Sequence, residues 1–534
     1  MNFDNLGIMM DCSRNAIMTV TQIEKFIDII SKMGYTNLQL YTEDTFEVNN
    51  EPYFGYLRGR YSKSELKQID EYAKAAGVEL IACVQTLAHL ESIMRWAPYM
   101  PISDNKDILM VDDERTYTLI DNIFMTLSEC FTSKRVNIGM DEAHMVGLGR
   151  YLDKYGYQDR FEILIRHLGK VANIAKKYGF KLMMWSDMFF KLVSGGNYYD
   201  ETVKFSQELI KKIPQDIDLI YWDYYSVDDN HYENMMNAHK QLANNIWFAG
   251  GAWTWTGFTP HNEFAIATIN SGIRMCKKCG IKNIFITMWG DNGGECSYFS
   301  ALPALMSAAM TAQGIEDEEA IKAKFYEIVG ESFDNFMKLD LPCKIGNAQA
   351  YENPDKYMLY NDLFLGELDS TVADGDKDVY KTYAKTLKDC VKNSKWDYLF
   401  DSASALCEVL YIKYDLGVVT RKAYKEGDKE KLIDLAYKDY NLLIKRIENF
   451  YTKFKTLWSI ENKPNGFDVQ DIRLGGLLMR VKNCRERLLQ YVDGAINKID
   501  ELEEELLDAF GQKEFTKSPT SINFWSMTVT PNNI

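Results

Sequence analysis

Short apolar runs alternate with helix-like stretches over about the first 320 residues of the chain. The apolar runs are nearly continuous, which is typical of strands buried on both faces. They predict eight strands, at residues 6–10, 37–41, 79–84, 135–140, 181–185, 218–222, 245–249 and 283–289. The stretches between them place apolar residues at helical spacing, and several end in the glycine that commonly stops a helix. The helices predicted in this way are 21–33, 64–76, 114–130, 159–178, 201–213, 230–243, 263–279 and 301–313.

This regular alternation predicts an α/β fold, a (β/α)8 TIM barrel. Functional residues of such a barrel lie at the carboxyl ends of its strands. The alternative is a doubly wound sheet, which usually carries a glycine-rich phosphate turn after its first strand. The corresponding turn here reads Asp-Cys-Ser-Arg, at residues 11–14, and contains no glycine. The barrel is therefore favoured.

Strand signals stop beyond residue 320, and long, charged, amphipathic helices follow, as at residues 378–392, 429–454 and 477–510. The sequence thus predicts a catalytic barrel over residues 1–320 and an all-α C-terminal domain over residues 321–534. We expect that domain to pack on the barrel or to join two chains as a homodimer. Residues 458–476 are rich in turn formers and predict a loop. Two roles are open for it: a plain connection, or a cap over an active site, its own or a neighbour's.

Composition and charge narrow the classes of protein. The chain has 534 residues, of which 46% are hydrophobic and 13% aromatic, so a disordered chain and a small disulfide scaffold are excluded. Its 61 basic and 77 acidic residues give a net charge of −16, without a dense basic block. Such a chain is a poor candidate for binding nucleic acid or an anionic membrane surface. No run reaches the ~18 apolar residues that span a bilayer.

The first residues and the cysteines bear on the compartment. A secretory signal begins with basic residues followed by an apolar core, and the N-terminal residues show neither. The ten cysteines are scattered, which indicates free thiols. We therefore expect a cytoplasmic protein. None of the six histidines forms a paired metal-binding motif, so no metal and no cofactor are predicted.

Acidic and aromatic side chains gather at the predicted strand ends. A pocket of acids and tryptophans suits a polar ring with apolar faces, and a pyranose sugar is the obvious fit. The residues at these strand ends are Asp11, Arg14, Glu43, Asp44, Gln85, His89, Asp141, Glu142, Trp185, Trp222, Tyr224, Tyr225, Trp253, Trp255, Trp289, Asp291 and Glu295.

The adjacent acids Asp141 and Glu142 are the sharpest of these features. A metal site, a helix cap and a helicase box are alternatives, but the helicase box needs a phosphate loop that the chain lacks. A glycosidase acid is favoured. Two-carboxylate retaining glycosidases place their acids about 5 Å apart on either side of the scissile bond. The end of the seventh strand, residues 250–255, offers no such second acid. Adjacent acids can still act together if a 2-acetamido oxygen of the substrate is the nucleophile.

At this point the sequence resembles glycoside hydrolase family 20, the β-N-acetylhexosaminidases. Residues 137–142, Asn-Ile-Gly-Met-Asp-Glu, are similar to the family's His-x-Gly-Gly-Asp-Glu, and residues 11–14 to its Asp-x-x-Arg. Trp185 matches the tryptophan of strand five, and residues 288–291, Met-Trp-Gly-Asp, resemble the Trp-x-Glu of strand eight. His89 stands where the family has the histidine of Pro-Gly-His. The resemblance covers the barrel and suggests a divergent intracellular branch with a helical C-terminal domain.

The resemblance implies a reaction and roles in it. The expected activity is the exo-acting removal of terminal β-linked GlcNAc or GalNAc from an oligosaccharide or glycoconjugate, with retention and with the acetamido oxygen as nucleophile. Glu142 would be the general acid and base, and Asp141 would orient the acetamido group. Arg14 would hold the 3- and 4-hydroxyls in a fork that lysine cannot form. A retaining glycosidase for another β-linked sugar and a non-catalytic sugar-binding protein remain alternatives.

The remaining site residues follow from the same resemblance and from its departures. The resemblance implies that Trp289 stacks beneath the sugar, that Trp185 and Trp222 wall the acetamido pocket, and that Asp291 binds the 4- or 6-hydroxyl. The family's strand-seven tyrosine is missing, and Trp253 and Trp255 stand in that segment instead. We expect both tryptophans to contact substrate. We expect Tyr224, or else Tyr225, to replace the tyrosine, and the two-residue period from Trp222 favours Tyr224.

Overall fold

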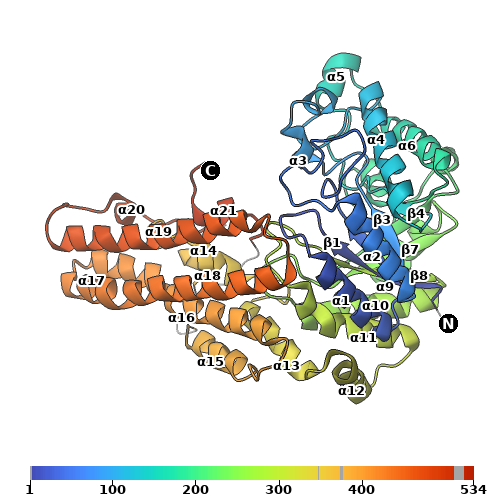
Figure 1. The fold of residues 1–534 in the computed structure, drawn as a ribbon. Coiled ribbons are helices and arrows are strands. Elements are labelled where there is room, and N and C mark those ends of the chain that lie inside the picture. Colours follow the sequence, from blue (N-terminus) through green and yellow to red (C-terminus); the bar gives the residue numbers. More distant parts are fainter. Residues whose placement is uncertain (1–2, 347, 373–376, 510, 512–521, 534) are drawn as a thin grey trace.

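Eight parallel strands close into a barrel in chain order (Figure 1). The fold is that of a computed structural model, which describes residues 3–346, 348–372, 377–509, 511 and 522–533. The strands are β1 Asn5–Asp11, β2 Asn37–Tyr41, β3 Glu79–Cys83, β4 Arg135–Asn137, β5 Lys181–Trp185, β6 Asp218–Trp222, β7 Ile246–Gly251 and β8 Asn283–Met288. Because β1 pairs with both β2 and β8, the sheet has no free edge. The predicted barrel is confirmed.

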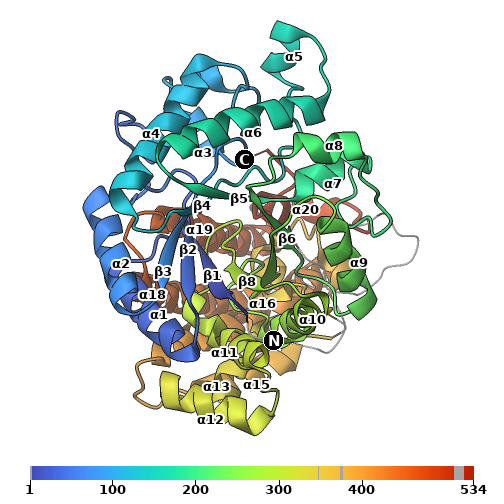
Figure 2. The same ribbon diagram turned by 90° about the vertical axis from the view of Figure 1, so that its right-hand side faces the viewer.

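A ring of helices surrounds these strands (Figure 2). They are α1 Val20–Met33, α2 Lys63–Ala75, α4 Glu114–Cys130, α6 Arg160–Lys177, α8 Gln207–Lys212, α9 Asp229–His239, α10 Asn262–Cys279 and α11 Leu302–Gln313. Their ends follow local chemistry. Ser62 and Glu65 form a reciprocal capping box at the start of α2, and Gly34 ends α1 with a left-handed φ of 98°.

Two elements of the barrel are shorter than predicted. Strand β4 ends at Asn137, because the Asn137 side chain accepts a hydrogen bond from the Gly139 amide (3.1 Å) and the chain turns there. Helix α8 begins only after Ser206, whose hydroxyl caps the Leu209 amide. Between strands and long helices lie short helices that were not predicted: α3 Glu91–Met94, α5 Arg150–Tyr155 and α7 Asp187–Val193.

The C-terminal part is helical wherever it has secondary structure among the described residues. Its helices are α12 Glu318–Val329, α13 Phe333–Met337, α14 Pro354–Tyr360, α15 Lys377–Lys388, α16 Asp397–Lys425, α17 Lys429–Leu435, α18 Asn441–Glu461, α19 Phe467–Val492, α20 Asp500–Glu503 and α21 Ser526–Val529. In Figure 1 the long helices extend to one side of the barrel. The predicted division at residues 320 and 321 falls inside α12 and stays a prediction.

The loop predicted at residues 458–476 is wrong. Helix α18 continues to Glu461 and α19 begins at Phe467, so only a short connection separates them. The indole of Trp458 and the ring of Phe467 are buried against each other, with centroids 5.5 Å apart. This packing outweighs the weak helix propensity of Gly475 and Gly476 within α19. That helix also ends at Val492, well before the predicted residue 510.

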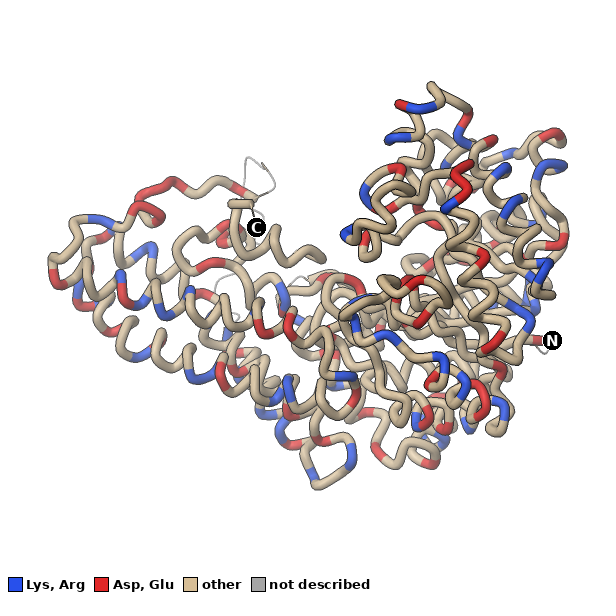
Figure 3. Tube along the Cα trace, turned by 45° about the horizontal axis from the view of Figure 1, so that its top comes forward, with Lys and Arg blue, Asp and Glu red and all other residues tan. Residues whose placement is uncertain are grey.

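Aromatic packing joins the helical part to the barrel. Phe258, in the segment after β7, contacts Phe450 and Phe454 of α18, each at 5.4 Å between ring centroids. Phe299 contacts Trp396 at 5.4 Å. Acidic and basic residues are interspersed over both parts (Figure 3). None of the described helices has the length and apolar character needed to cross a membrane.

Candidate active site

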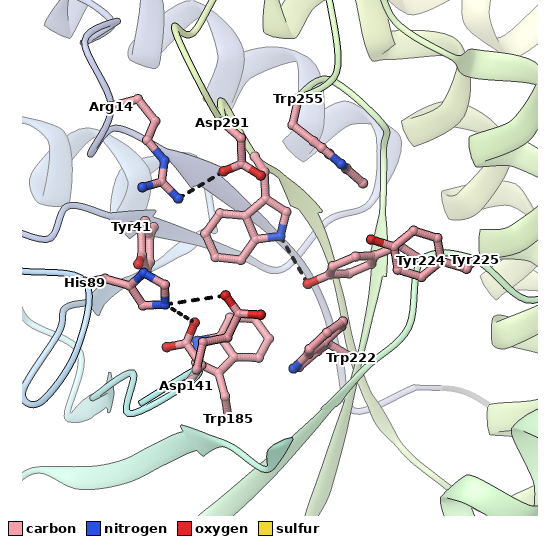
Figure 4. Close-up of a pocket in the computed structure, with 12 residues that line it drawn as sticks. Arg14, Tyr41, His89, Asp141, Trp185, Trp222, Tyr224, Tyr225, Trp255 and Asp291 are labelled. Atoms are coloured by element: carbon pink, nitrogen blue, oxygen red, sulfur yellow. Dashed lines mark hydrogen bonds and ion pairs between the residues drawn. The ribbon is translucent and has the colours of Figure 1, made fainter. Parts of the chain in front are cut away.

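A pocket opens at the carboxyl ends of the strands (Figure 4). It contains ten of the eleven side chains predicted to form the site, and two tyrosines besides. Its lining residues are Arg14, Tyr41, His89, Asp141, Glu142, Trp185, Trp222, Tyr224, Tyr225, Trp255, Trp289 and Asp291. The barrel therefore brings together side chains from nearly every part of its first 300 residues.

The turn after β4 holds the two adjacent acids in an unusual backbone conformation. Gly139, Met140 and Glu142 have positive φ angles of 71°, 66° and 50°. Such angles are unfavourable for residues with a side chain and must be held by neighbours. The side-chain oxygen Oε1 of Gln85 accepts a hydrogen bond from the Met140 amide (3.1 Å), and the Asp187 carboxylate accepts one from the Glu142 amide (3.0 Å). These contacts fix where both acids point.

Asp141 lies between two donors. The Gln85 amide donates to one of its oxygens at 2.7 Å, and the His89 ring nitrogen Nε2 lies 3.3 Å from the other. Burial alone would lower the pKa of His89, but the Asp141 carboxylate raises it to about 10. Burial opposes ionisation of Asp141 too, yet the charge of His89 and the two donors hold its pKa below its usual value. Asp141 is thus an anion paired with a cationic histidine.

Glu142 has the opposite environment. Its side chain is 44% exposed, and its nearest ionic neighbours, Lys191 and His89, lie at 3.7 and 3.8 Å. Burial and the negative charges of Asp141 and Asp187 raise its pKa. Two carboxyl groups that are adjacent in sequence therefore favour different protonation states, an arrangement found where one acts as an acid and the other as an anion.

Arg14 forms the polar corner of the pocket. Its guanidinium lies 3.4 Å from Asp11, 3.3 Å from Glu43 and 2.9 Å from Asp291. Burial opposes its charge, but the carboxylates of Glu43 and Asp291 raise its pKa well above the usual value. The group is a fixed cation. Figure 4 shows it beside Asp291 at the edge of the pocket.

Aromatic rings form the remaining walls. Trp289 meets Tyr41 edge to face at 4.8 Å and lies 6.0 Å from Trp185. Trp222 stacks on Tyr224 at 5.3 Å. The indole N–H of Trp289 donates to the Tyr224 hydroxyl (3.1 Å), and the Thr287 side chain also contacts that hydroxyl, which keeps its own proton as a donor.

The expectation for Trp253 is wrong, because it does not line the pocket. Its side chain is 2% exposed, its N–H donates to the Tyr224 carbonyl oxygen (2.8 Å), and its ring stacks on Trp255 at 4.5 Å. Strand β7 ends at Gly251, and Trp253 has a φ of 46°, so strand alternation no longer applies. Trp253 instead packs against Trp255 and against Tyr224 in the segment that follows β6.

One lining residue, Tyr41, was not among the predicted site residues, and a second, Tyr225, was named only as the alternative to Tyr224. Tyr41 is the last residue of β2, and its hydroxyl donates to Glu43 (3.0 Å) and accepts from Gln85 (3.0 Å). Its position at a strand end was a usable signal. Tyr225 lines the pocket beside Tyr224. Among the described residues, no group of three or more His, Cys, Asp or Glu could hold a metal ion.

Several hexosaminidases are similar to part of this chain. The cattle (Bos taurus) protein hexosaminidase D is 21% identical over 344 residues, 60% of this chain and 92% of that protein. Human (Homo sapiens) hexosaminidase D is 23% identical over 226 residues, 40% of this chain and 43% of that protein. The chain thus spans less than half of the human relative. A solved exo β-N-acetylglucosaminidase of Vibrio harveyi aligns with a TM-score of 0.46 at 13% identity, over 63% of this chain and 58% of that one.

Two family models match separate parts of the chain. Residues 3–244 match the glycosyl hydrolase family 20 catalytic domain. Residues 331–521 match the glycoside hydrolase 20C C-terminal domain. The first match covers the strands that carry Arg14, His89, Asp141 and Glu142, and the second covers most of the helical part. The chain therefore belongs to glycoside hydrolase family 20.

Proposed function

We propose that this glycoside hydrolase removes terminal β-linked N-acetylhexosamine residues, GlcNAc or GalNAc, from oligosaccharides or glycoconjugates. The observation that carries this is the pair Asp141 and Glu142, adjacent in one turn, with pKa values shifted in opposite directions. Asp291, the other carboxylate among the described residues that line the pocket, is ion-paired with Arg14. An internal nucleophile from the substrate fits this arrangement better than a second enzymic carboxylate.

In the first step, the 2-acetamido oxygen attacks C1 while the bond between C1 and the leaving oxygen breaks. Glu142, whose raised pKa favours the protonated form, gives its proton to that oxygen. Asp141 accepts a hydrogen bond from the acetamido N–H and stabilises the oxazolinium cation. One of its oxygens already accepts from Gln85 and the other is ion-paired with His89, but each retains a lone pair that can accept. The Tyr224 O–H donates to the acetamido oxygen.

In the second step, water attacks C1 on the face that the leaving group left. Glu142, now ionised, takes the proton of that water, the bond from C1 to the acetamido oxygen breaks, and the sugar leaves with its original anomeric configuration. The acetamido group and both enzymic acids return to their starting states.

The rest of the pocket holds the sugar. Trp289 offers an apolar face for the ring, while Arg14 and Asp291 offer a donor and an acceptor for hydroxyls at its far end. This polar corner is fixed by three carboxylates around Arg14. A site closed by such a corner suits a terminal residue, which supports exo action.

Hydrolysis of p-nitrophenyl β-GlcNAc and p-nitrophenyl β-glucoside tests the proposal. We expect cleavage of the first, little cleavage of the second, and tight binding of a GlcNAc-thiazoline, which mimics the oxazolinium intermediate. NMR of the first-formed sugar should show the β-anomer. Cleavage of the glucoside without cleavage of the β-GlcNAc substrate would rule out the acetamido mechanism. Binding of sugar without hydrolysis of any substrate would favour a non-catalytic sugar-binding protein.

A further inference from the structure

The segment that follows β8 has a shape that its own sequence permits but does not specify. It carries Asp291, and the next three residues, Asn292, Gly293 and Gly294, all have positive φ angles, of 49°, 133° and 55°. Asn and Gly tolerate such angles, but two successive glycines leave the chain many alternative conformations, so external contacts must select this one. We call residues 290–295 the β8 loop.

Contacts from the helical part surround this loop. Arg473 of α19 donates to the Asn292 carbonyl oxygen (2.8 Å) and side chain (2.9 Å), and lies 2.9 Å from Glu295. Lys356 of α14 lies 2.6 Å from the other Glu295 oxygen and donates to the same Asn292 carbonyl (3.1 Å). Gln470 of α19 donates to the Gly293 carbonyl oxygen (3.1 Å).

These contacts are buried. The side chains of Lys356 and Glu295 are each 1% exposed, and that of Arg473 is 12% exposed. A buried ion pair is weak evidence of added stability, but removing one partner leaves an uncompensated charge, so the geometry is strongly specified. The helical part therefore restricts the β8 loop to one arrangement.

The barrel fixes the other end of the same loop. The Gly290 amide donates to Asp11 (3.0 Å), and Asp291 next to it lies 2.9 Å from Arg14. Asp291 is thus held from both sides. On one side Gly290 is bound to Asp11 of the barrel, and on the other side Asn292 is bound to Arg473 and Lys356 of the helical part.

We propose that Arg473 and Lys356 of the helical domain are positioning residues for substrate recognition: they hold the β8 loop so that Asp291 and Arg14 meet the sugar hydroxyls. The inference rests on the proposed function and deepens it. It makes the helical domain part of the recognition machinery of the barrel, although neither residue lines the pocket.

The test is a double-mutant cycle between Arg473→Met and Asp291→Ala, with kcat and KM measured on p-nitrophenyl β-GlcNAc. We expect Arg473→Met to lower kcat/KM by about ten- to a hundredfold, as small misplacements of positioning groups do. In the Asp291→Ala background Arg473→Met should lower kcat/KM by about twofold or less, because the two residues act as one unit. A purely structural role of Arg473 would lower activity equally in both backgrounds.

Arg480→Met is the matched control. Arg480 lies on the same helix and pairs with Asp362 of the helical part (2.6 Å), away from the β8 loop. We expect it to leave kcat/KM unchanged, and thermal unfolding should be recorded for every variant. If Arg473→Met does not fold, Gln470→Met, which removes one contact to Gly293, should show a smaller loss that also disappears without Asp291.

Equal losses for Arg473→Met and Arg480→Met, or a full loss from Arg473→Met without Asp291, would overturn the inference while leaving the proposed function intact. A wild-type protein that cleaves no N-acetylhexosaminide would overturn the proposed function and this inference with it.

Discussion

At the scale of single residues, the site depends on how differently two neighbouring carboxyl groups are treated. Asp141 receives a cation and an amide donor, whereas Glu142 receives burial and two nearby anions. Each environment comes from a different strand end, with Gln85 and His89 after β3 and Asp187 after β5. The difference between the two acids therefore depends on the barrel as well as on their being adjacent in sequence.

Glu142→Gln should lower kcat by about 10²–10⁴-fold on substrates with poor leaving groups, since general acid catalysis contributes on that order. The loss should be much smaller when the leaving group departs without a proton. Rates on a series of aryl β-GlcNAc substrates of graded leaving-group acidity measure this. A loss of the same size across the series would argue against the acid role.

Lys191→Met should move the alkaline limb of the kcat/KM profile to higher pH. Glu142 must carry its proton, so activity falls as the pH rises through its pKa. The charge of Lys191 lowers that pKa, and its removal should raise it further. Lys177→Met, which removes an ion pair with Asp121 on the surface, should leave the profile in place. If the alkaline limb of the kcat/KM profile does not move in Lys191→Met, this assignment of charges is contradicted.

Tyr224→Phe should lower kcat by about 10²-fold, the usual cost of losing one donor to a developing charge. The matched variant is Tyr225→Phe, because Tyr225 also lines the pocket but its side chain is far more exposed. We expect it to retain most of the activity. A larger loss from Tyr225→Phe would assign the acetamido contact to Tyr225. Equal losses from the two variants would contradict its assignment to Tyr224 alone.

At the scale of elements, the turn after β4 is the most constrained part of the barrel. Gln85 joins three pieces of it, because it bonds to the Met140 amide, to Asp141 and to Tyr41. Replacing this one side chain removes support from the turn and from the Asp141 carboxylate together.

Gln85→Met should lower kcat/KM and reduce the free energy of unfolding by about 1–3 kcal/mol, because buried polar partners lose their hydrogen bonds. Gln39→Met is the control. Gln39 is fully buried in β2, and neither its side-chain oxygen nor its nitrogen has a hydrogen-bond partner among the described residues. We expect that variant to keep its activity and stability. Denaturant unfolding and kinetics of both variants check this, and similar losses in both would count against the role of Gln85.

The sequence was informative where the period of the apolar residues, or the position of a residue at a strand end, is enough to predict the structure. Alternation of apolar runs and helices predicted the barrel, and strand-end positions predicted most of the residues that line the pocket, with Tyr225 named only as the alternative to Tyr224, Tyr41 left out and the buried Trp253 included. Period alone could not predict the positive φ angles after β4, because contacts from Gln85 and Asp187 maintain them. Nor could turn propensity predict that α19 begins at Phe467, since packing against Trp458 decides it.

At the scale of the whole molecule, the barrel and the helical part share one packed interface. Phe258 lies between Phe450 and Phe454, and Glu295 of the barrel is paired with two cations of the helical part. An interface with both apolar and buried ionic contacts couples the stabilities of the two parts.

Calorimetry of the wild-type protein should therefore show one cooperative transition. Phe258→Ala should destabilise the protein by about 3–5 kcal/mol, as large-to-small changes in a core do, and lower that transition as a whole. Tyr326→Ala, which truncates an exposed ring on α12, should have little effect. Two separate transitions in the wild-type protein would show that the parts unfold independently.

The gathering of indoles around the pocket also has an optical consequence. Trp185, Trp222, Trp255 and Trp289, four of the ten tryptophans in the chain, line one cavity. A sugar that covers them changes the polarity around a large share of the emitting groups. The natural fluorescence of the protein should therefore report occupancy of the site directly, so that ligands can be titrated without a label and without turnover.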